Sequence, residues 1–187
     1  MHQDIRQTIR LIREDIYFRC EYEHKPTGAM ALLKMLIQPG VFCVALYRWQ
    51  VFLDTHQLRP LAGILKLFNL FAFGVSIDSR AIISGGLVII HANSIYISDR
   101  VQIGARCILF HQNWIGYSPF AQENTSDPDG LNGPIIGANI IFGAGACAVG
   151  PIVLGDGCKV GVNASVDSSF PAGAVLFGVP ARQISKS

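Results

Sequence analysis

The chain has 187 residues, of which half are apolar and 15% are charged, and its formal net charge is +2. This length predicts one domain, or a small domain with an appendage, that can bury a sizeable core. Between Arg106 and Lys159 the sequence has no lysine or arginine. That gap argues against a nucleic-acid surface, which needs clustered cations. The apolar excess predicts that part of the surface is buried between subunits.

Cysteine usage and the first residues bear on the compartment. The five cysteines show no CxxC pairing, and we interpret them as small buried hydrophobes in a reducing compartment. Residues 1–24 carry acidic and basic side chains throughout, unlike a signal peptide. The most apolar stretch, Leu61 to Val75, contains Lys66 and Asn69 and is too short to cross a bilayer, although peripheral membrane contact stays an alternative. We therefore expect a cytoplasmic protein without a transmembrane segment.

Residues 1–74 are predicted to form an α-helical region, because apolar residues recur there at spacings of three and four. A first helix with one apolar face is interrupted at Pro26 and Gly28. Pro39 and Gly40 are expected to separate a second helix from an aromatic-rich third one. The predicted helices are one that contains Ile5 to Ile16, and others at Ala29–Ile37, Val41–Asp54 and about Pro60–Phe73.

Residues 75–187 are predicted to form a β-helix, because apolar residues recur there every six positions. Neither the helical period of 3.6 residues nor strand alternation gives this spacing. A unit so short cannot bury its apolar side chains alone and must stack on its neighbours, as in hexapeptide β-helices. The same period occurs earlier in the chain, out of phase, between residues 77 and 109. The C-terminal series is Ile136, Phe142, Ala148, Leu154, Val160 and Val166.

A polar segment at about residues 112–134, rich in Asn, Asp, Ser and Gly, interrupts this repeat. Long loops inside compact domains are uncommon and are often functional. We therefore expect a protruding loop that lines or covers a site, with a tolerated surface insertion as the alternative.

Three motifs carry a resemblance to a known family. They are the stretch from Gly86 to Ser98, the glycine-rich run from Ile136 to Gly150, and the closing GVPAR at Gly178 to Arg182. Together with the hexads, they resemble the left-handed parallel β-helix acyltransferases of the hexapeptide-repeat superfamily, and within these the serine acetyltransferase branch. The resemblance implies a mainly β fold with an N-terminal α-helical region and acetyl-CoA as the co-substrate. It also implies a homotrimer with active sites between neighbouring β-helices.

Acyl transfer to a hydroxyl needs a base, and histidine suits this role because its pKa lies near neutral pH. His91 stands where the resemblance implies the catalytic histidine, and His111, at the start of the loop, is a second candidate for lining the site. A structural role in a β-helix corner is the alternative for His91. A carboxylate usually orients such a base. Ser76 takes the place of the family's aspartate, so we expect Asp78, two residues further on, or a water held by Ser76 to orient His91.

The resemblance also implies where CoA binds. Backbone amides of Gly143, Ala144, Gly145 and Ala146 would hold the pantetheine arm, and Gly161 would allow its close approach to the main chain. Lys159 and Arg182 would hold phosphates, and cations are rare in this half of the chain. No metal is expected, because a γ-class carbonic anhydrase-like site would need three converging histidines and this half contains two.

The residues by which the family grips serine are mostly replaced. Lys25 and Ile90 stand where the family has aspartates, and Asn132-Gly133 stands where it has an Arg-His pair. Burying a zwitterion without partners of opposite charge would be costly. We therefore predict a neutral hydroxyl acceptor, such as a sugar or polysaccharide unit or a secondary metabolite. The loop also carries acidic residues (Glu123, Asp127, Asp129) and aromatic ones suited to a sugar face (Trp114, Tyr117, Phe120).

Two alternatives stay open, a serine O-acetyltransferase of cysteine biosynthesis and a non-catalytic β-helical scaffold. The sequence ends in Lys186-Ser187 and lacks the terminal isoleucine by which many members dock into cysteine synthase, so that complex is not expected. The helical region is short for the branch, which leaves trimer and hexamer both open.

Overall fold

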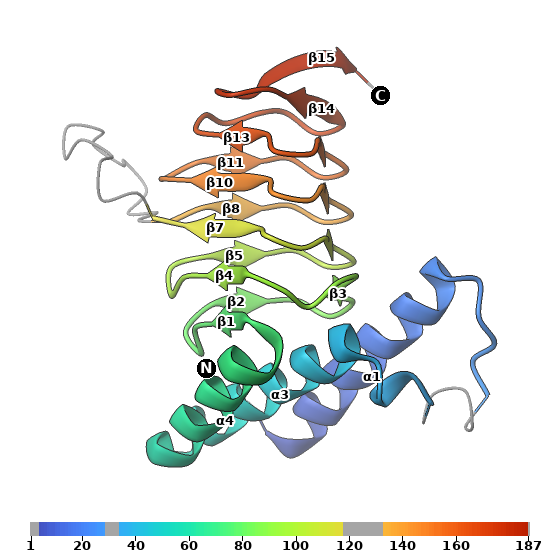
Figure 1. The fold of residues 1–187 in the computed structure, drawn as a ribbon, viewed down its shortest axis with the longest axis vertical. Helices are drawn as coiled ribbons and strands as arrows, with labels where there is room; N and C mark the ends of the chain where they lie inside the picture. The colour runs from blue at the N-terminus through green and yellow to red at the C-terminus, as the bar shows by residue number, and fades with distance from the viewer. Residues whose placement is uncertain (1–3, 29–33, 118–132, 187) are drawn as a thin grey trace.

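The computed structural model describes residues 4–28, 34–117 and 133–186, and it places helices at the base of a tall stack of short strands (Figure 1). The helices are α1 (Ile5–Tyr22), α3 (Pro39–Thr55) and α4 (Arg59–Phe73). Asp4 caps α1 by accepting a hydrogen bond from the Gln7 amide at 2.7 Å. Gly74, with φ of 62°, ends α4, and the strands begin at the next residue.

The break predicted at Pro39 and Gly40 lies two residues earlier, at Ile37 and Gln38, and Pro39 and Gly40 form the first turn of α3. Proline is tolerated at this position, since the N–H that it lacks would have no partner within the helix. The helix predicted at 29–37 falls partly outside the described residues.

The strands form three sheets that the chain visits in turn. One sheet has the order β1-β4-β7-β10-β13, the second β11-β8-β5-β2, and the third β15-β14-β12-β9-β6-β3. The strands are β1 (Val75–Ile77), β2 (Ile82–Ile83), β3 (Val88–Ile89), β4 (Ile95–Ile97), β5 (Gln102–Ile103), β6 (Ile108–Leu109), β7 (Trp114–Gly116), β8 (Ile135–Ile136), β9 (Ile141–Phe142), β10 (Cys147–Val149), β11 (Val153–Leu154), β12 (Lys159–Val160), β13 (Ser165–Val166), β14 (Ala174–Phe177) and β15 (Arg182–Lys186).

Each sheet is one wall of a parallel β-helix. Strand partners such as Tyr96 and Trp114, or Cys147 and Ser165, lie three hexads apart in the sequence. The hexad residues point inward and are buried, as the side chains of Phe142 and Leu154 illustrate. The antiparallel strand β15 pairs with β14 and ends the stack (Figure 1). The predicted β-helix is therefore confirmed.

The hexads up to Ile89 are out of phase with those from Ile97 on because one corner of the first coil is longer, and the polar interruption shifts the series from Ile136 again. Ile89 pairs with Leu109 and Ile97 pairs with Ile115. Leu109 and Ile115 are six positions apart, whereas Ile89 and Ile97 are eight apart. Two extra residues therefore lie in the corner between β3 and β4, which contains His91.

The helices close the open edge of the first coil. A terminal repeat of a solenoid has main-chain groups without a neighbouring coil, and these need other partners. Side chains of α1 and α3 supply them over all three walls. The bonds run from Gln50 to the Ile77 carbonyl at 3.0 Å, from Tyr47 to Ala81 at 2.8 Å, from Arg48 to Ile83 and Ser84 at 2.6 and 2.7 Å, and from Arg19 to Ile89 at 2.9 Å.

The outward face of α4 is apolar, and Phe71 is its most exposed large side chain at 84%. Within the described ranges, no helix is both long enough and apolar enough to cross a membrane. The other large apolar residues exposed on α4 are Leu61, Ile64, Leu67, Phe68 and Leu70.

Candidate active site

The two histidines of the β-helix lie at the same corner on successive coils. Each follows a strand of the third sheet by two residues, His91 after β3 and His111 after β6, and these strands pair in register. Their ring centroids are 5.8 Å apart with the planes at 65°. Phe110 also contacts the His91 ring edge to face, with centroids 6.5 Å apart. The register therefore brings together the two histidines that the sequence singled out.

The two imidazoles differ in environment. The His91 side chain is exposed, and none of the hydrogen bonds among the described residues involves its ring. His111 is half-buried, and its Nδ1 is enclosed without a hydrogen-bond partner among the residues that the structure describes. An exposed imidazole without a partner is free to accept a proton from an incoming hydroxyl.

The predicted CoA residues continue the same corner on the next coils. Phe142 pairs with Leu109 and Val160 pairs with Phe142, so Gly143-Ala144 and Gly161-Val162 follow in register above Phe110-His111. Neighbouring coils lie about 4.8 Å apart. This corner of the β-helix therefore carries one column of residues, which we call the corner column: His91, His111, Ala144 and Val162.

A main-chain amide of this corner can bind a ligand only if its N–H does not already donate a hydrogen bond within the coil. The amides of Gly143, Gly145 and Ala146 already donate to the carbonyls of Val160, His111 and Gly143. Three of the four amides predicted to hold pantetheine therefore maintain the coil. In the described part of the chain, the amides of the corner column donate no main-chain hydrogen bond. Within the run from Gly143 to Ala146, the amide of Ala144 is therefore the one that remains available to donate to a ligand.

The two predicted phosphate contacts lie toward the C-terminal end of the stack. Lys159 is exposed on β12. Arg182 is exposed on β15 and pairs with Phe177 of β14. By the register of β12 and β14, Phe177 lies beside Gly161 on the next coil. The corner column thus runs from the histidines toward two cations, while the exposed side chains of Phe177 and Val162 add apolar surface beside it.

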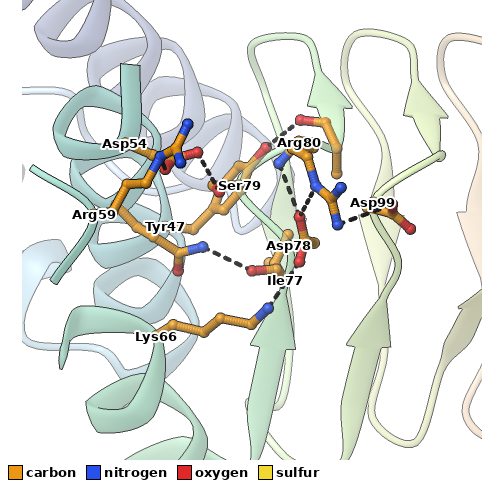
Figure 2. A network of polar contacts seen from close by, with 11 residues as sticks. Tyr47, Asp54, Arg59, Lys66, Ile77, Asp78, Ser79, Arg80 and Asp99 are labelled. Carbon is orange, nitrogen blue, oxygen red and sulfur yellow. Dashed lines mark hydrogen bonds and ion pairs between the residues drawn. The ribbon is translucent and has the colours of Figure 1, made fainter. Parts of the chain in front are cut away.

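Asp78 does not lie beside His91, contrary to the prediction. Asp78 follows β1 at the corner that leads to the second sheet, whereas His91 follows β3. The Asp78 carboxylate accepts hydrogen bonds from Lys66 at 2.9 Å and from the side chain of Arg80 at 3.2 Å (Figure 2). Burial alone would raise the pKa of Asp78, but the bonds from Lys66 and Arg80 outweigh burial and lower it. Asp78 is thus part of the contact between α4 and the first coil.

Ser76 lies in the middle of β1, beside Tyr96 of β4. Among the described residues, no hydrogen bond joins its hydroxyl to His91. Tyr96 was missed by sequence reasoning. Its ring stacks on Trp114 of β7 with centroids 6.1 Å apart and planes at 17°. Alternation along short strands, which puts Tyr96 and Trp114 on the outer face of one wall, is the signal that could have found this pair.

The polar interruption begins later than predicted. Trp114 lies in β7, which pairs with β10, so this residue belongs to the β-helix. Tyr117 follows this strand and is exposed. Other predicted loop residues, Phe120, Glu123, Asp127, Asp129 and Asn132, lie outside the described residues. Across residues 4–28, 34–117 and 133–186, no three His, Cys, Asp or Glu side chains gather as a metal ion would require.

Comparisons with known proteins add to this geometry. No family model matches the chain. It is 31% identical to a serine acetyltransferase of Mycobacterium tuberculosis over 94% of this chain and 73% of the relative. It is 30% identical to one of Helicobacter pylori over 81% of this chain and 85% of the relative.

A solved relative has the same fold. The serine acetyltransferase of Neisseria gonorrhoeae in complex with serine matches with a TM-score of 0.79 and 25% identity, covering 94% of this chain and 68% of its own. The mainly β fold with a left-handed parallel β-helix and N-terminal helices is thereby confirmed.

Proposed function

The chain belongs to the serine acetyltransferase family, and from this premise we propose that it transfers the acetyl group of acetyl-CoA to the hydroxyl of L-serine. As a family member it is an acetyl-CoA-dependent acyltransferase, so the alternative of a non-catalytic scaffold is wrong. The sequence pattern favoured a neutral acceptor, but the relatives favour its alternative, serine. Similarity to serine acetyltransferases over nearly the whole chain is the observation that carries the proposal.

His91 is the proposed base. Its exposed ring takes the proton of the serine hydroxyl as the oxygen attacks the thioester carbonyl. The carbonyl π electrons move onto oxygen, and collapse of the tetrahedral intermediate breaks the C–S bond. The imidazolium of His91 then returns its proton to the departing thiolate. Among the described residues, no carboxylate hydrogen-bonds to His91.

The corner column is the proposed path of the pantetheine arm. The amides of Ala144 and Val162 have no partner in the described structure and can donate to the arm's carbonyls. Lys159 and Arg182 lie toward the end of the stack where the phosphates would then bind. This path leads the thioester from the C-terminal coils down toward His111 and His91, because the column follows the axis of the β-helix.

A homotrimer is also proposed. The exposed apolar residues of α4 and the exposed His91 both suit a surface that a neighbouring protomer completes. Sedimentation of the purified chain would measure this: a monomer at enzymatic concentrations would contradict the proposal.

A neutral hydroxyl compound is the second candidate acceptor, and the residues beside His91 favour it. Ile90 precedes His91, and the ring of Phe110 contacts it, so apolar side chains lie beside the base together with the His111 ring. The stacked pair of Tyr96 and Trp114 offers aromatic surface on the adjoining wall, which suits a sugar face.

The experiment is a turnover assay with acetyl-CoA and either L-serine or a panel of sugars and nucleotide sugars. We expect CoA release with serine, and its loss in His91→Ala by at least about 10²-fold. His56→Ala, which removes an exposed histidine from the α3–α4 turn, serves as the matched control and should keep full activity. Turnover with a sugar and not with serine would contradict serine as the acceptor and support a neutral hydroxyl compound instead. Undiminished turnover by His91→Ala would contradict the proposed base.

A further inference from the structure

His111 contains a buried polar atom that has no partner in the described part of the chain. Its Nδ1 is enclosed and makes no hydrogen bond with the described residues. An unsatisfied buried polar atom costs about 1–3 kcal/mol, so proteins keep few of them. A proton on this nitrogen would be a buried donor without an acceptor. We therefore assign the proton of the neutral ring to Nε2, which makes His111 a hydrogen-bond donor at the other edge of the ring.

The place of His111 in the corner column defines what this donor can meet. His111 lies one coil from His91 and one coil from Ala144, with which it shares the register. A pantetheine arm that descends along Val162 and Ala144 therefore reaches His111 before it reaches the base. The rings of the two histidines stand at 65° with centroids 5.8 Å apart, which leaves them in edge contact without a hydrogen bond between them.

We infer that His111 is a second catalytic residue, whose Nε2–H donates a hydrogen bond to the carbonyl oxygen of the acetyl thioester. This inference rests on the proposed function. When the hydroxyl oxygen bonds to the carbonyl carbon, the π pair moves onto the carbonyl oxygen and His111 stabilises that negative charge. No proton leaves His111; the hydroxyl proton goes to His91 and then to the CoA thiolate as the C–S bond breaks. A donor aimed at a developing oxyanion is among the strongest devices of acyl transfer.

The stretching frequency of the acetyl carbonyl tests this contact directly. Acetyl-CoA labelled with carbon-13 at the carbonyl is bound to the full chain, and its infrared band is compared with that of the free compound. We expect a downward shift in the unaltered protein, because a hydrogen bond weakens the C=O bond. The shift should vanish in His111→Ala, persist partly in His111→Gln, whose amide keeps an N–H donor, and remain in His91→Ala.

Kinetics add an independent readout. Removing one oxyanion donor lowers kcat by about 10²–10³-fold. We expect that loss for His111→Ala, a smaller one for His111→Gln, and a dissociation constant for CoA within about threefold of the unaltered value, because CoA has no acetyl carbonyl.

The outcomes distinguish a failure of the proposed acetyltransferase function from a failure of the inference about His111. Failure of the unaltered chain to bind acetyl-CoA would overturn the proposed function and this inference with it. Binding with a carbonyl band that is the same in the unaltered chain and in His111→Ala would overturn the inference alone. So would a shift that disappears in His91→Ala instead, since His91 would then be the donor. Thermal unfolding of each variant checks that it is folded.

Discussion

Arg48 of α3 and Asp15 of α1 form an ion pair at 2.9 Å that also holds the first coil of the β-helix. Arg48 donates to the carbonyls of Ile83 and Ser84, and Asp15 accepts from the amides of Gly86 and Leu87, both at 2.8 Å. Burial raises the pKa of Asp15, while Arg48 and the two amides oppose that shift. The pair thus joins two helices to the edge of the stack, and both charges are almost completely buried.

Breaking this pair from either side should destabilise the chain strongly. Arg48→Met leaves the Asp15 carboxylate without its counter-charge, and Asp15→Asn leaves the guanidinium uncompensated. Removing one partner of a buried pair costs about 3–5 kcal/mol of unfolding free energy, measurable by urea denaturation. Arg10→Ala, which breaks the exposed pair with Glu14, is the matched control and should change stability little. Equal effects at the buried and exposed pairs would contradict the capping role.

The ion pair of Asp78 predicts a dependence of stability on pH. Lys66 and Arg80 lower the pKa of this carboxyl in the folded chain, despite its partial burial. Unfolding then takes up a proton at acidic pH, so the contribution is fully present above the ordinary value of 3.8 and is lost as pH falls through the folded pKa.

Asp78→Asn should therefore lose stability near pH 7, by about 0.5–1 kcal/mol because the group is partly exposed. It should also show a shallower decline in unfolding free energy in acid. Asp99→Asn keeps both partners of Asp78 and is the comparison. An acid decline that is identical in Asp78→Asn and the unaltered chain would show that this carboxyl does not contribute.

The architecture was accessible from the sequence because the hexad period depends on local spacing alone. Every hexad residue points inward, as Ile136 and Val166 do, so the pattern reports the coil directly. The cap was not accessible in this way. Arg48 and Asp15 are far apart in the sequence, and only the packing of α1 on α3 shows that they meet.

The site was predicted in part. Register brings His91, His111 and Ala144 into one column, whereas Asp78 lies at another corner for a physical reason. The alternation that placed Ser76 and Asp78 on one face applies only within a strand, and β1 ends at Ile77. Asp78 is therefore a corner residue, and Lys66 of α4 lies within reach of it.

Buried thiols should resist modification in the native chain. Burial raises the pKa of the Cys43 thiol to about 12 and that of Cys107 to about 11, so almost no thiolate is present at pH 8. We expect a disulfide-forming reagent to leave both residues unmodified until urea unfolds the chain. Cys147, which is half-buried beside Ser165, is the internal comparison and should react first. Rapid modification under native conditions would mean local opening, of α3 in the case of Cys43 and of the coil before β6 in the case of Cys107.

Two glycines of the corner should respond differently to the same substitution. A Cβ at Gly143 would lie 2.8 Å from the amide nitrogen of Val162 and 2.9 Å from the carbonyl carbon of Gly161, and neither main-chain atom can move without distorting the next coil. A Cβ at Gly161 would instead meet the ring of Phe177, which is 45% exposed and can rotate away.

Gly143→Ala should therefore lower the free energy of unfolding by about 1–3 kcal/mol through overpacking, whereas Gly161→Ala should leave it nearly unchanged. The displaced Phe177 ring then has to occupy surface beside the corner column, so Gly161→Ala should weaken binding of CoA more than it weakens the fold. Urea denaturation and calorimetric titration with CoA measure the two effects on the same variants. If Gly161→Ala bound CoA as the unaltered chain does, that result would contradict the proposed path of the pantetheine arm past Gly161 and Val162.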